Sequence, residues 1–587
     1  MEKNTIIAIL LSTLVVVATL FVQAKFFPPT QAVTKTETQQ PVIADAGESQ
    51  GIAASSALVD SGDSAIAGVV TTIEGKAPAA EERVVIETDL VKVEFTNKGG
   101  DIVSYKLKKH LDKDGEVEMA DAVTAGNRAF SIILGDANGP VIDQLFNVKR
   151  ISDTEIGFFK AITVRGTDGK EQTFTLAKQY SFKPDDYVFE LKVIIDGDSA
   201  MTGLQFGNAG YTIRTSPQIG PRYEAKKDKY EFRRFFHLVN GKKKNTTVNA
   251  GQTKLVTDKW SWAGVGGKYF IIAALPEAPV QSATYSTLSE PGAAPNAQLF
   301  VTRTPVAGNR QTDVWRFYVG PRTEKDLVRY NLMANNPYGL NDTQLDKALE
   351  SSGILAPLER LLKWIMELFY KVVKNWGVSI ILLTVLTRLL FFPLTRKSSE
   401  ASVKMQEVQP RIQEIQEKYR GNPQKLNEEM AKLYQATGYN PVSGCLPLLI
   451  QFPLIFAMYN LFNNYFEFRG AMFIPGWIPD LSRGDSVLSF GYTLPLNISE
   501  LRLLPIIYVI SQLVYGKVTQ TPGTTQQNST MKFMMYGMPL IFFFIFYNAP
   551  SGLLIYWTFS NVLTMGQQVI INRMMHRKKA ASAAPAK

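Results

Sequence analysis

The chain is poor in the residues that build covalent cross-links, metal sites and common catalytic centres. Cys445 is its one cysteine, so no intrachain disulfide can form, and we interpret it as a small packed apolar side chain. The three histidines, His110, His237 and His576, are too far apart for a metal-ligand motif. An HExxH pattern is missing, and the glycine-rich stretch 264–268 lacks P-loop spacing. The sequence therefore predicts no catalytic residues, no metal, no cofactor and no enzyme.

The overall composition looks globular, but charges and apolar residues are unevenly distributed. Hydrophobic residues make up 45% and charged residues 20% of the chain, yet the last third carries several long apolar runs. The formal net charge is +10, and Lys and Arg cluster beside those runs, at 396–432 and 573–579. This placement favours contact with membrane lipid and a role in membrane topology over specific binding of nucleic acid.

The N-terminal apolar run, Ile6–Val22, is just long enough to span a bilayer. We expect residues 1–24 to form a retained transmembrane anchor, because the run exceeds the usual length of a signal-peptide core. A cleaved signal peptide is the alternative, since the run ends near a small residue, Ala24. In both cases, the segment that follows is exported. Residues 25–80 are rich in Ala, Ser, Thr, Gln and Gly, which predicts a flexible linker.

Residues 81–345 have the pattern of an exported all-β domain. Short segments that alternate between apolar and polar residues are typical of strands with one buried face. A turn at Asn97–Asp101 lies between the first two of these segments, and many short strands with such turns predict a β-sandwich. The basic residues of this part are interpreted as a solvated face. The predicted strands include Val91–Phe95, Ile102–Tyr105, Tyr187–Val193, Ala297–Thr302 and Val314–Val319.

An amphipathic helix is expected at 354–372. Its apolar residues recur at helical spacing, while Arg360, Lys363, Glu367 and Lys371 occupy other faces. We interpret it as an interfacial helix on the outer membrane surface, because a long apolar run follows directly. A helix packed on a soluble core is the alternative.

Five long apolar runs follow within residues 373–575. Together with the N-terminal anchor, they predict a multi-pass α-helical membrane protein with six transmembrane helices. The positive-inside rule places both termini, the basic tail 576–587 and the segment 396–438 in the cytoplasm, and the β-domain on the opposite side. The five runs are 378–394, 447–462, 503–515, 533–547 and 553–571.

The segment 396–438 is predicted to be a helical hairpin. Gly421 and Pro423 interrupt the helical pattern between its two arms. The hairpin is either purely structural or a flexible contact arm for a nascent chain or a ribosome. Apolar residues on the first arm are spaced as in a coiled-coil seam, at Met405, Val408, Ile412 and Ile415.

Arg388 is the most unusual residue of the first long apolar run. Scales from membrane insertion put the cost of Arg at the centre of a membrane helix at roughly 2.5–3.5 kcal/mol. The side chain could extend to the cytoplasmic surface, because Arg396 lies about two turns further along. We favour a hydrated cavity, because Thr384 lies one helical turn before Arg388 on the same face.

Further polar residues in the other runs support a hydrated groove. No Asp or Glu lies deep enough in these runs to pair with Arg388. A counter-charge would therefore arrive with a bound client. Besides Arg388 and Thr384, the predicted groove residues are Trp557, Asn561, Gln451, Ser511 and Gln512.

Several motifs of the second half resemble those of a known family. The block from Leu394 to Pro410, the block Asn440–Pro453 and the block Pro550–Trp557 are similar to the YidC family of membrane protein insertases. The resemblance covers roughly residues 355–575, where it implies a five-helix insertase core that the family shares. The N-terminal anchor and the exported domain resemble the Gram-negative type, whose periplasmic domain is a β-supersandwich.

The resemblance also implies roles for particular residues. Arg388 matches the groove arginine of the family and Thr384 its groove-lining threonine. Trp557 stands where many members have tyrosine, so a strict need for a hydroxyl there is in doubt. The implied location is the bacterial inner membrane. The implied partners are nascent integral membrane proteins, which the family inserts and helps to fold and assemble, alone or with the Sec translocon.

These elements predict a mechanism that needs no nucleotide. Charge attracts the short, acidic tail of a client toward Arg388, and the groove shortens the dry distance to be crossed. The apolar segment of the client then slides into lipid, driven by about 25 cal/mol per Å² of apolar surface removed from water. The residues predicted to form the apolar slide are Phe452, Pro453, Met538, Phe542 and Ile545.

A solute or ion transporter is the main competing class, because polar residues inside a membrane also mark transport pathways. Paired half-repeats and an intramembrane carboxylate relay, which are typical of transporters, are missing from the sequence. Taken with the family motifs, these absences favour an insertase.

Overall fold

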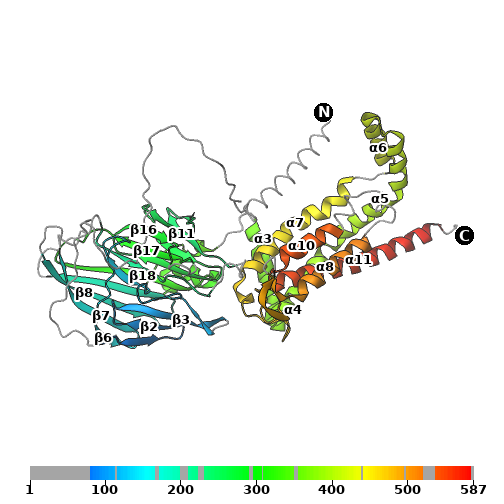
Figure 1. The fold of residues 1–587 in the computed structure, drawn as a ribbon. Coiled ribbons are helices and arrows are strands. Elements are labelled where there is room, and N and C mark those ends of the chain that lie inside the picture. Colours follow the sequence, from blue (N-terminus) through cyan, green and yellow to red (C-terminus); the bar gives the residue numbers. More distant parts are fainter. Residues whose placement is uncertain are drawn as a thin grey trace. The chain divides into compact units, whose positions relative to one another are not determined.

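The computed structural model describes residues 80–112, 115–165, 171–197, 209–222, 231–289, 295–306, 308–349, 355–437, 441–494, 498–519 and 536–583. The predicted anchor, 1–24, and all but the last residue of the predicted linker, 25–80, lie outside these ranges. The described chain has a β-rich first part and a helical second part (Figure 1).

The largest sheet of the β-rich part has nine described strands, and all neighbouring strands are antiparallel. Strands β2 (Val91–Thr96) and β9 (Val188–Gly197), which belong to two different sheets, confirm two segments predicted by alternation. In spatial order the nine strands are β12 (Lys242–Thr246), β11 (Arg234–Val239), β14 (Trp262–Gly266), β15 (Phe270–Pro276), β18 (Arg310–Pro321), β9, β8 (Glu171–Phe182), β7 (Glu155–Arg165) and β6 (Asn147–Ser152).

Two smaller antiparallel sheets cover one face of the nine-stranded sheet. The register places Phe182 of β8 and Phe235 of β11 on the same face. Phe182 lies against Phe95 with ring centroids 6.2 Å apart, and Phe235 lies 5.0 Å from Tyr285. One small sheet contains β1 (Arg83–Glu87), β2, β3 (Asp101–Asp112) and β4 (Gly115–Glu118); the other contains β13 (Thr253–Val256), β16 (Val280–Ser286), β17 (Gln298–Arg303), β10 (Tyr211–Arg214) and β5 (Ser131–Leu134).

The turn between β2 and β3 anchors this domain electrostatically. Gly99 and Gly100 have φ values of +70° and +61°, and a Cβ at either position would clash with neighbouring atoms. The turn delivers Asp101 into the core, where its side chain is fully buried. Its two carboxylate oxygens accept from Lys178 Nζ at 2.6 Å and Arg128 Nε at 3.0 Å. The predicted turn motif therefore ends in a buried ion cluster.

Helix α2 (Glu324–Val328) and short 3-10 helices at Arg329–Asn331, Met333–Asn335 and Leu345–Ala348 follow the last strand of the β-rich part. A further 3-10 helix spans Phe466–Phe468. The main described helices are α3 (Ala356–Val373), α4 (Trp376–Leu390), α5 (Phe392–Lys418), α6 (Pro423–Thr437), α7 (Pro441–Asn464), α8 (Leu503–Thr519), α10 (Met538–Phe546) and α11 (Ser551–Ala583).

A second hydrophobic core joins α3, α4, α7, α8 and α11. Helix α3 buries Leu362 and Met366 in this core. At the start of α4, Trp376 stacks on Tyr370 with centroids 3.9 Å apart and meets Tyr465, just beyond α7, edge-on at 5.3 Å. The start of α4 and the end of α7 therefore lie at the same end of the bundle.

None of the helices in the described ranges is both long enough and apolar enough to cross a membrane. The count of six transmembrane helices stays a prediction.

The apolar run 378–394 does not form one continuous helix, which corrects the sequence-based expectation. Helix α4 ends at Leu390, a turn follows at Phe391, and α5 begins at Phe392 with Pro393 in its first turn. Proline lacks a backbone N–H and disfavours helical geometry in the preceding residue, so it is tolerated where a helix begins.

Helices α5 and α6 form the predicted hairpin. The break falls at 419–422, and Pro423 is the first residue of α6. The side chain of Asn422 accepts from the Lys425 amide at 3.1 Å, which caps the second arm. Val408 and Ile412 are buried and Ile415 is half-buried, whereas the side chain of Met405 lies outside the described ones.

Candidate functional site

Arg388 lies in the last turn of α4, and its side chain is half-buried. Its guanidinium Nη2 donates a hydrogen bond to the hydroxyl of Ser560 on α11. Ser560 is 4% exposed, so the charged head of Arg388 is directed toward the neighbouring helix. Contact between α4 and α11 positions the guanidinium.

A second side chain of α11 contacts the backbone of Arg388. Gln567 donates from Nε2 to the Arg388 carbonyl at 3.1 Å. The last carbonyls of a helix lack partners within the helix and are commonly satisfied by side chains. Ser560 and Gln567 are seven residues apart and lie on the face of α11 toward α4. Ser560 contacts the guanidinium of Arg388, and Gln567 contacts its backbone carbonyl.

Within the ranges that the structure describes, no carboxylate lies within ion-pair distance of Arg388, whose polar partners are Ser560 and Gln567. Those ranges also contain no group of three or more His, Cys, Asp or Glu residues that could hold a metal ion. The site has a fixed cation and neutral hydrogen-bonding groups. Such a site can attract and orient an anionic group.

Thr384 is fully buried, one turn before Arg388. Its hydroxyl donates to the Ile380 carbonyl at 2.7 Å, within the same helix. Thr387, next to Arg388, likewise bonds the Thr384 carbonyl at 2.9 Å. Both hydroxyls are thus satisfied by their own helix, as is common for Thr in a helix interior.

A second polar cluster joins α8 to α11. Asn561 donates from Nδ2 to the Ser511 hydroxyl at 2.9 Å, and Ser511 donates to the Tyr508 carbonyl at 2.7 Å. Gln512 donates to the phenolic oxygen of Tyr508 at 2.9 Å. Three of the predicted groove residues are therefore linked through Tyr508.

Trp557 lies beside this second cluster. Its ring centroid is 5.5 Å from that of Tyr508 on α8 and 4.7 Å from that of Phe546 at the end of α10. The indole thus joins three helices through aromatic contacts. The neighbouring residue Tyr556 is buried and packs against Phe462 of α7 at 5.6 Å.

The predicted groove residues thus divide between two faces of α11. Arg388 and Thr384 lie on α4, whereas Asn561, Ser511 and Gln512 belong to the cluster with α8. Gln451 belongs to α7, but its side chain lies outside the described ones.

Ser560, Gln567 and Tyr508 were not predicted from the sequence. The signal was present for two of them, because Ser560, Thr564 and Gln567 repeat at helical i, i+4, i+7 spacing.

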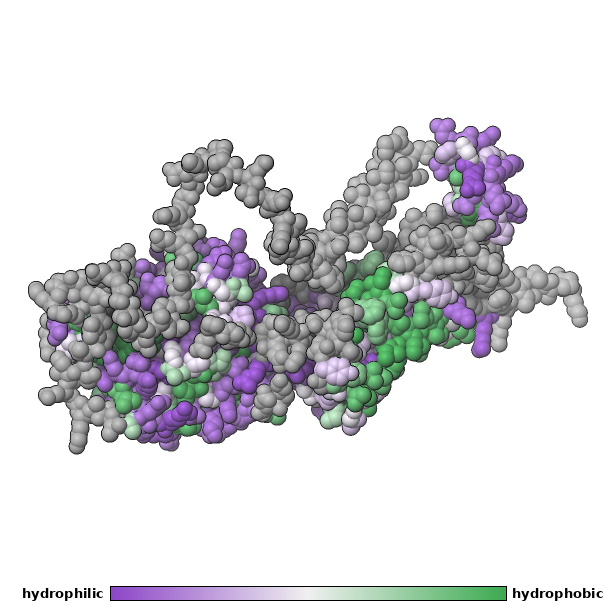
Figure 2. All heavy atoms as spheres, in the orientation of Figure 1, coloured by the Kyte–Doolittle hydropathy of each residue, from purple (hydrophilic) through white to green (hydrophobic). Residues whose placement is uncertain are grey.

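The predicted slide residues lie on two helices with apolar surfaces. On α7, Phe452 is 40% exposed and Pro453 is exposed too. On α10, Ile545 is 42% exposed, while Met538 and Phe542 are half-buried. Figure 2 shows hydrophobic residues gathered over the helical part of the chain.

The apolar exposure extends well beyond these five residues. Contiguous exposed apolar surface of this kind marks contact with membrane or protein. Large exposed apolar side chains of the bundle include Leu386, Leu389, Leu390, Ile507, Ile510, Val514, Leu540, Ile541, Phe544, Val562, Val569 and Ile570.

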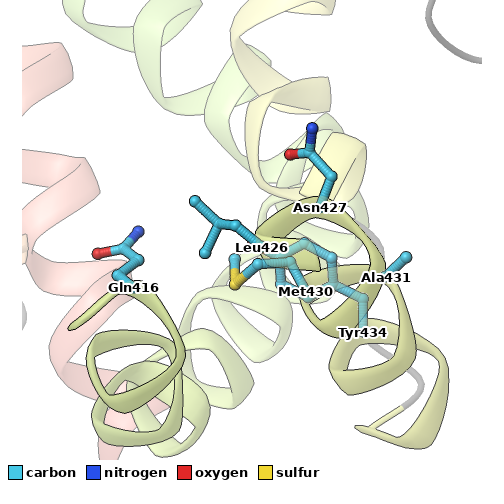
Figure 3. A pocket seen from close by; sticks show the side chains of 6 residues that line it. All are labelled: Gln416, Leu426, Asn427, Met430, Ala431 and Tyr434. Atoms are coloured by element: carbon cyan, nitrogen blue, oxygen red, sulfur yellow. The ribbon is translucent and has the colours of Figure 1, made fainter. Parts of the chain in front are cut away.

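A cavity of about 390 Å³ lies between the arms of the hairpin (Figure 3). Gln416 contributes from α5, and the remaining lining residues come from α6. The thioether of Met430 and the ring of Tyr434 give the cavity an adaptable apolar wall. The lining residues of α6 are Leu426, Asn427, Met430, Ala431 and Tyr434.

A larger cleft, of about 970 Å³, lies in the β-rich part. Arg233 in its wall is fully occupied, because it donates to Gln218, to Glu231 and to three backbone carbonyls. Arg222 on the rim is exposed and pairs with Asp121 at 3.3 Å. This cleft has a mixed polar and apolar lining.

Two protein-family descriptions match the two parts of the chain. The family described as YidC periplasmic domain matches residues 83–362. The family described as 60Kd inner membrane protein matches residues 368–579.

Full-length relatives match along almost the whole chain. Membrane protein insertase YidC of Treponema denticola is 52% identical over 586 residues, which cover 98% of this chain and 100% of the relative. The protein of the same name from Treponema pallidum is 43% identical over 635 residues, which cover 99% of this chain and 100% of the relative. A crystal structure of active YidC insertase with its first transmembrane domain is 18% identical, covers 84% of this chain and 93% of that one, and gives a TM-score of 0.33.

Proposed function

Because this chain belongs to the YidC family of membrane protein insertases, inner-membrane proteins with a periplasmic domain, we propose that it inserts clients along a hydrophilic groove centred on Arg388. Its substrates are membrane proteins, and it is not an enzyme. The proposed groove contains Arg388, Thr384, Trp557, Gln451, Ser511, Gln512 and Asn561.

The state of Arg388 is the single observation that carries this proposal. Its guanidinium is half-buried and donates to a neutral hydroxyl, and no carboxylate among the described residues pairs with it. Removing such a cation from water costs several kcal/mol unless it is hydrated or paired. A hydrated groove lowers that cost before binding, and an acidic tail of a client supplies the counter-charge during insertion.

The groups around Arg388 have different roles in this scheme. Ser560 and Gln567 fix the guanidinium and the helix that carries it, so the charge is oriented before a client arrives. Thr384 shapes the wall, because its hydroxyl is already bonded to Ile380. The Asn561–Ser511 bond holds α8 against α11 beside the groove.

Release into lipid follows from the exposed apolar surface. We propose that the apolar segment of the client moves along Phe452 and Pro453 of α7 and along Met538, Phe542 and Ile545 of α10. Each Å² of apolar surface that passes from water into lipid contributes about 25 cal/mol. The same surface can hold a client helix transiently, which is the physical basis for a chaperone role.

The membrane topology is part of the proposal. We place both termini and the α5–α6 hairpin in the cytoplasm, with six spans including the N-terminal anchor. Helix α3 would lie on the outer surface, because it exposes an apolar stripe opposite its buried residues: Leu361, Trp364, Leu368 and Val372.

The hairpin is the proposed contact arm. The Met430 and Tyr434 wall of its cavity suits an apolar segment of a nascent chain, and its exposed charges suit a ribosome surface. We also propose that the protein works alone for short-tailed clients and beside the Sec translocon for clients with large exported domains.

The test is insertion of a short-tailed, single-span client into proteoliposomes that contain only this protein, without nucleotide. Insertion above the level of empty liposomes is expected, together with unchanged leakage of small solutes. Absence of insertion from correctly oriented, folded protein would contradict autonomous function. Client-independent solute flux would instead favour a transporter.

A further inference from the structure

Two short strands that precede α8 form a small sheet of their own. Strand β19 (Leu488–Leu494) pairs with β20 (Ile498–Leu501) in an antiparallel sheet of two described strands. Leu488 lies opposite Leu501. A two-stranded hairpin on its own is marginally stable at best in water, so this element needs a further partner.

One face of the hairpin is apolar and exposed. Leu488 and Ser489 pair regularly with Leu501 and Glu500, so their side chains point to opposite faces. The register then shifts between Ser489 and Leu494, and the ring contact of Phe490 with Tyr492 places those two side chains on the same side. Leu488 is 56% and Tyr492 64% exposed, and the rings of Phe490 and Tyr492 lie 6.1 Å apart. The adjacent residue Ser489 lies on the other face and is exposed too. The hairpin thus exposes two large apolar side chains, Leu488 and Tyr492, whereas Phe490 between them is half-buried.

The base of the hairpin is fixed to the start of α8. The Val487 amide donates to the Leu501 carbonyl at 3.0 Å. Just before the hairpin, the buried carboxylate of Asp485 accepts from the amides of Leu503 and Leu504, at 2.7 and 3.0 Å. The apolar face is therefore held at the N-terminal end of a helix that exposes apolar residues of its own.

This end of the bundle also carries the exposed apolar stripe of α3. Helix α3 leads into the start of α4, where Trp376 contacts Tyr465. Tyr465 begins the segment that connects α7 to β19, β20 and α8. The charges at the hairpin base are mutually paired, with Arg502 Nη2 3.1 Å from Glu500. Two exposed apolar surfaces thus share one end of an inner-membrane protein.

We propose that the β19–β20 hairpin lies in the boundary between headgroups and acyl chains at this end of the bundle, with Leu488, Phe490 and Tyr492 directed into lipid. Aromatic side chains favour this boundary, because the ring is apolar and the tyrosine hydroxyl stays wet. The hairpin and α3 then fix the depth of α8 and α4 in the membrane. The proposal depends on the inner-membrane location of the family and not on the role of Arg388.

The test uses a fluorescent label on single cysteines in a Cys445→Ser background, in proteoliposomes. Tyr492→Cys and Leu488→Cys report on the apolar face, and Ser489→Cys is the matched control on the opposite face. We expect a nitroxide held near the lipid headgroup to quench the labels at 492 and 488, while aqueous iodide preferentially quenches the label at 489. Thermal unfolding equal to that of the background protein verifies that each variant is folded.

Two results would overturn the proposal. Equal iodide quenching at all three positions would mean that the apolar face is in water. Labels at 492 and 488 that are shielded from both quenchers would mean that a protein covers this face, either a client or a second copy of the chain. Cross-linking at 492 would then separate those two occupants.

Discussion

The environment of Arg388 depends on two neutral polar side chains of α11, those of Ser560 and Gln567. An arginine inside an apolar run is conspicuous in any sequence, so its importance could be predicted. The spacing of Ser560 and Gln567 places them on one face of α11, but their contact with Arg388 depends on the rotation of α11 against α4, which the sequence does not give. Asn561, one residue after Ser560, contacts α8 instead.

Ser560→Ala should reduce insertion of acidic-tailed clients without unfolding the protein. A hydrogen bond to a charged group contributes about 1.5–3 kcal/mol, and its loss lets the guanidinium leave its fixed orientation. The reduction should be smaller than for Arg388→Ala, because the charge remains. Insertion into proteoliposomes measures this. Thr564→Ala, one turn along α11, is the control and should insert as wild type does.

Asp101→Asn should strongly destabilise the β-rich domain. The substitution leaves Lys178 and Arg128 buried without their carboxylate, and loss of one partner of a buried pair costs about 3–5 kcal/mol. Denaturant unfolding of the purified chain checks this. Asp143→Asn is the control, because its pair with Lys98 is exposed and 3.7 Å apart. Equal stability of both variants would contradict the ion-cluster interpretation.

His237 should make the β-rich domain less stable in acid. Burial lowers the pKa of His237 more than Asp258, 3.6 Å away, raises it. The unfolded chain therefore binds the proton more readily, so stability is full above the unfolded pKa of about 6.5 and is lost as the pH falls toward the folded value. Hydrogen-exchange protection of β11 should fall as the pH drops below about 6.5, and His237→Gln should flatten this change. An equally steep fall in the variant would exclude His237 as its source.

At the scale of elements, helix positions were largely predictable and their ends were not. Apolar periodicity located α3 and the hairpin arms, and a long apolar run located α8. The end of α4 at Leu390 depends on Pro393, which lies inside the apolar run 378–394. Strands β19 and β20 were not predicted from the sequence, although apolar residues stand at alternate positions from Leu488 to Tyr492.

The cap of α8 shows why some ends cannot be predicted locally. Its carboxylate comes from Asp485, 18 residues before Leu503, and the intervening hairpin brings the two together. A capping motif is normally sought within about three residues of the helix start.

Asp485→Ala should loosen the start of α8. Loss of an N-cap costs about 0.5–2 kcal/mol, and Trp477 also loses the acceptor of its indole N–H, 2.9 Å away. Hydrogen exchange at Leu503 and Leu504 should accelerate, while exchange in α3 stays unchanged. Ser489→Ala, which changes an exposed side chain of β19, is the control. Unchanged exchange in Asp485→Ala would show that the cap does not hold this end.

At the scale of the whole molecule, the division into a β-rich part and a helical part followed from alternating segments in the first part and long apolar runs in the second. The spatial order of the nine-stranded sheet did not, because it places β9 beside β18. Pairing between strands so distant in the chain leaves no trace in local periodicity. Function did not depend on this strand order, because the family motifs alone indicated an insertase.

The most direct test of the proposed role of Arg388 compares clients whose tails differ only in replacement of Asp and Glu by Asn and Gln. Insertion into proteoliposomes is measured for wild type, Arg388→Ala and, as a control for general positive charge, Arg396→Ala about two helical turns further on. We expect insertion by wild type and Arg396→Ala to rise with tail acidity and Arg388→Ala to abolish this dependence. The same dependence in all three proteins would contradict a client-binding role for Arg388.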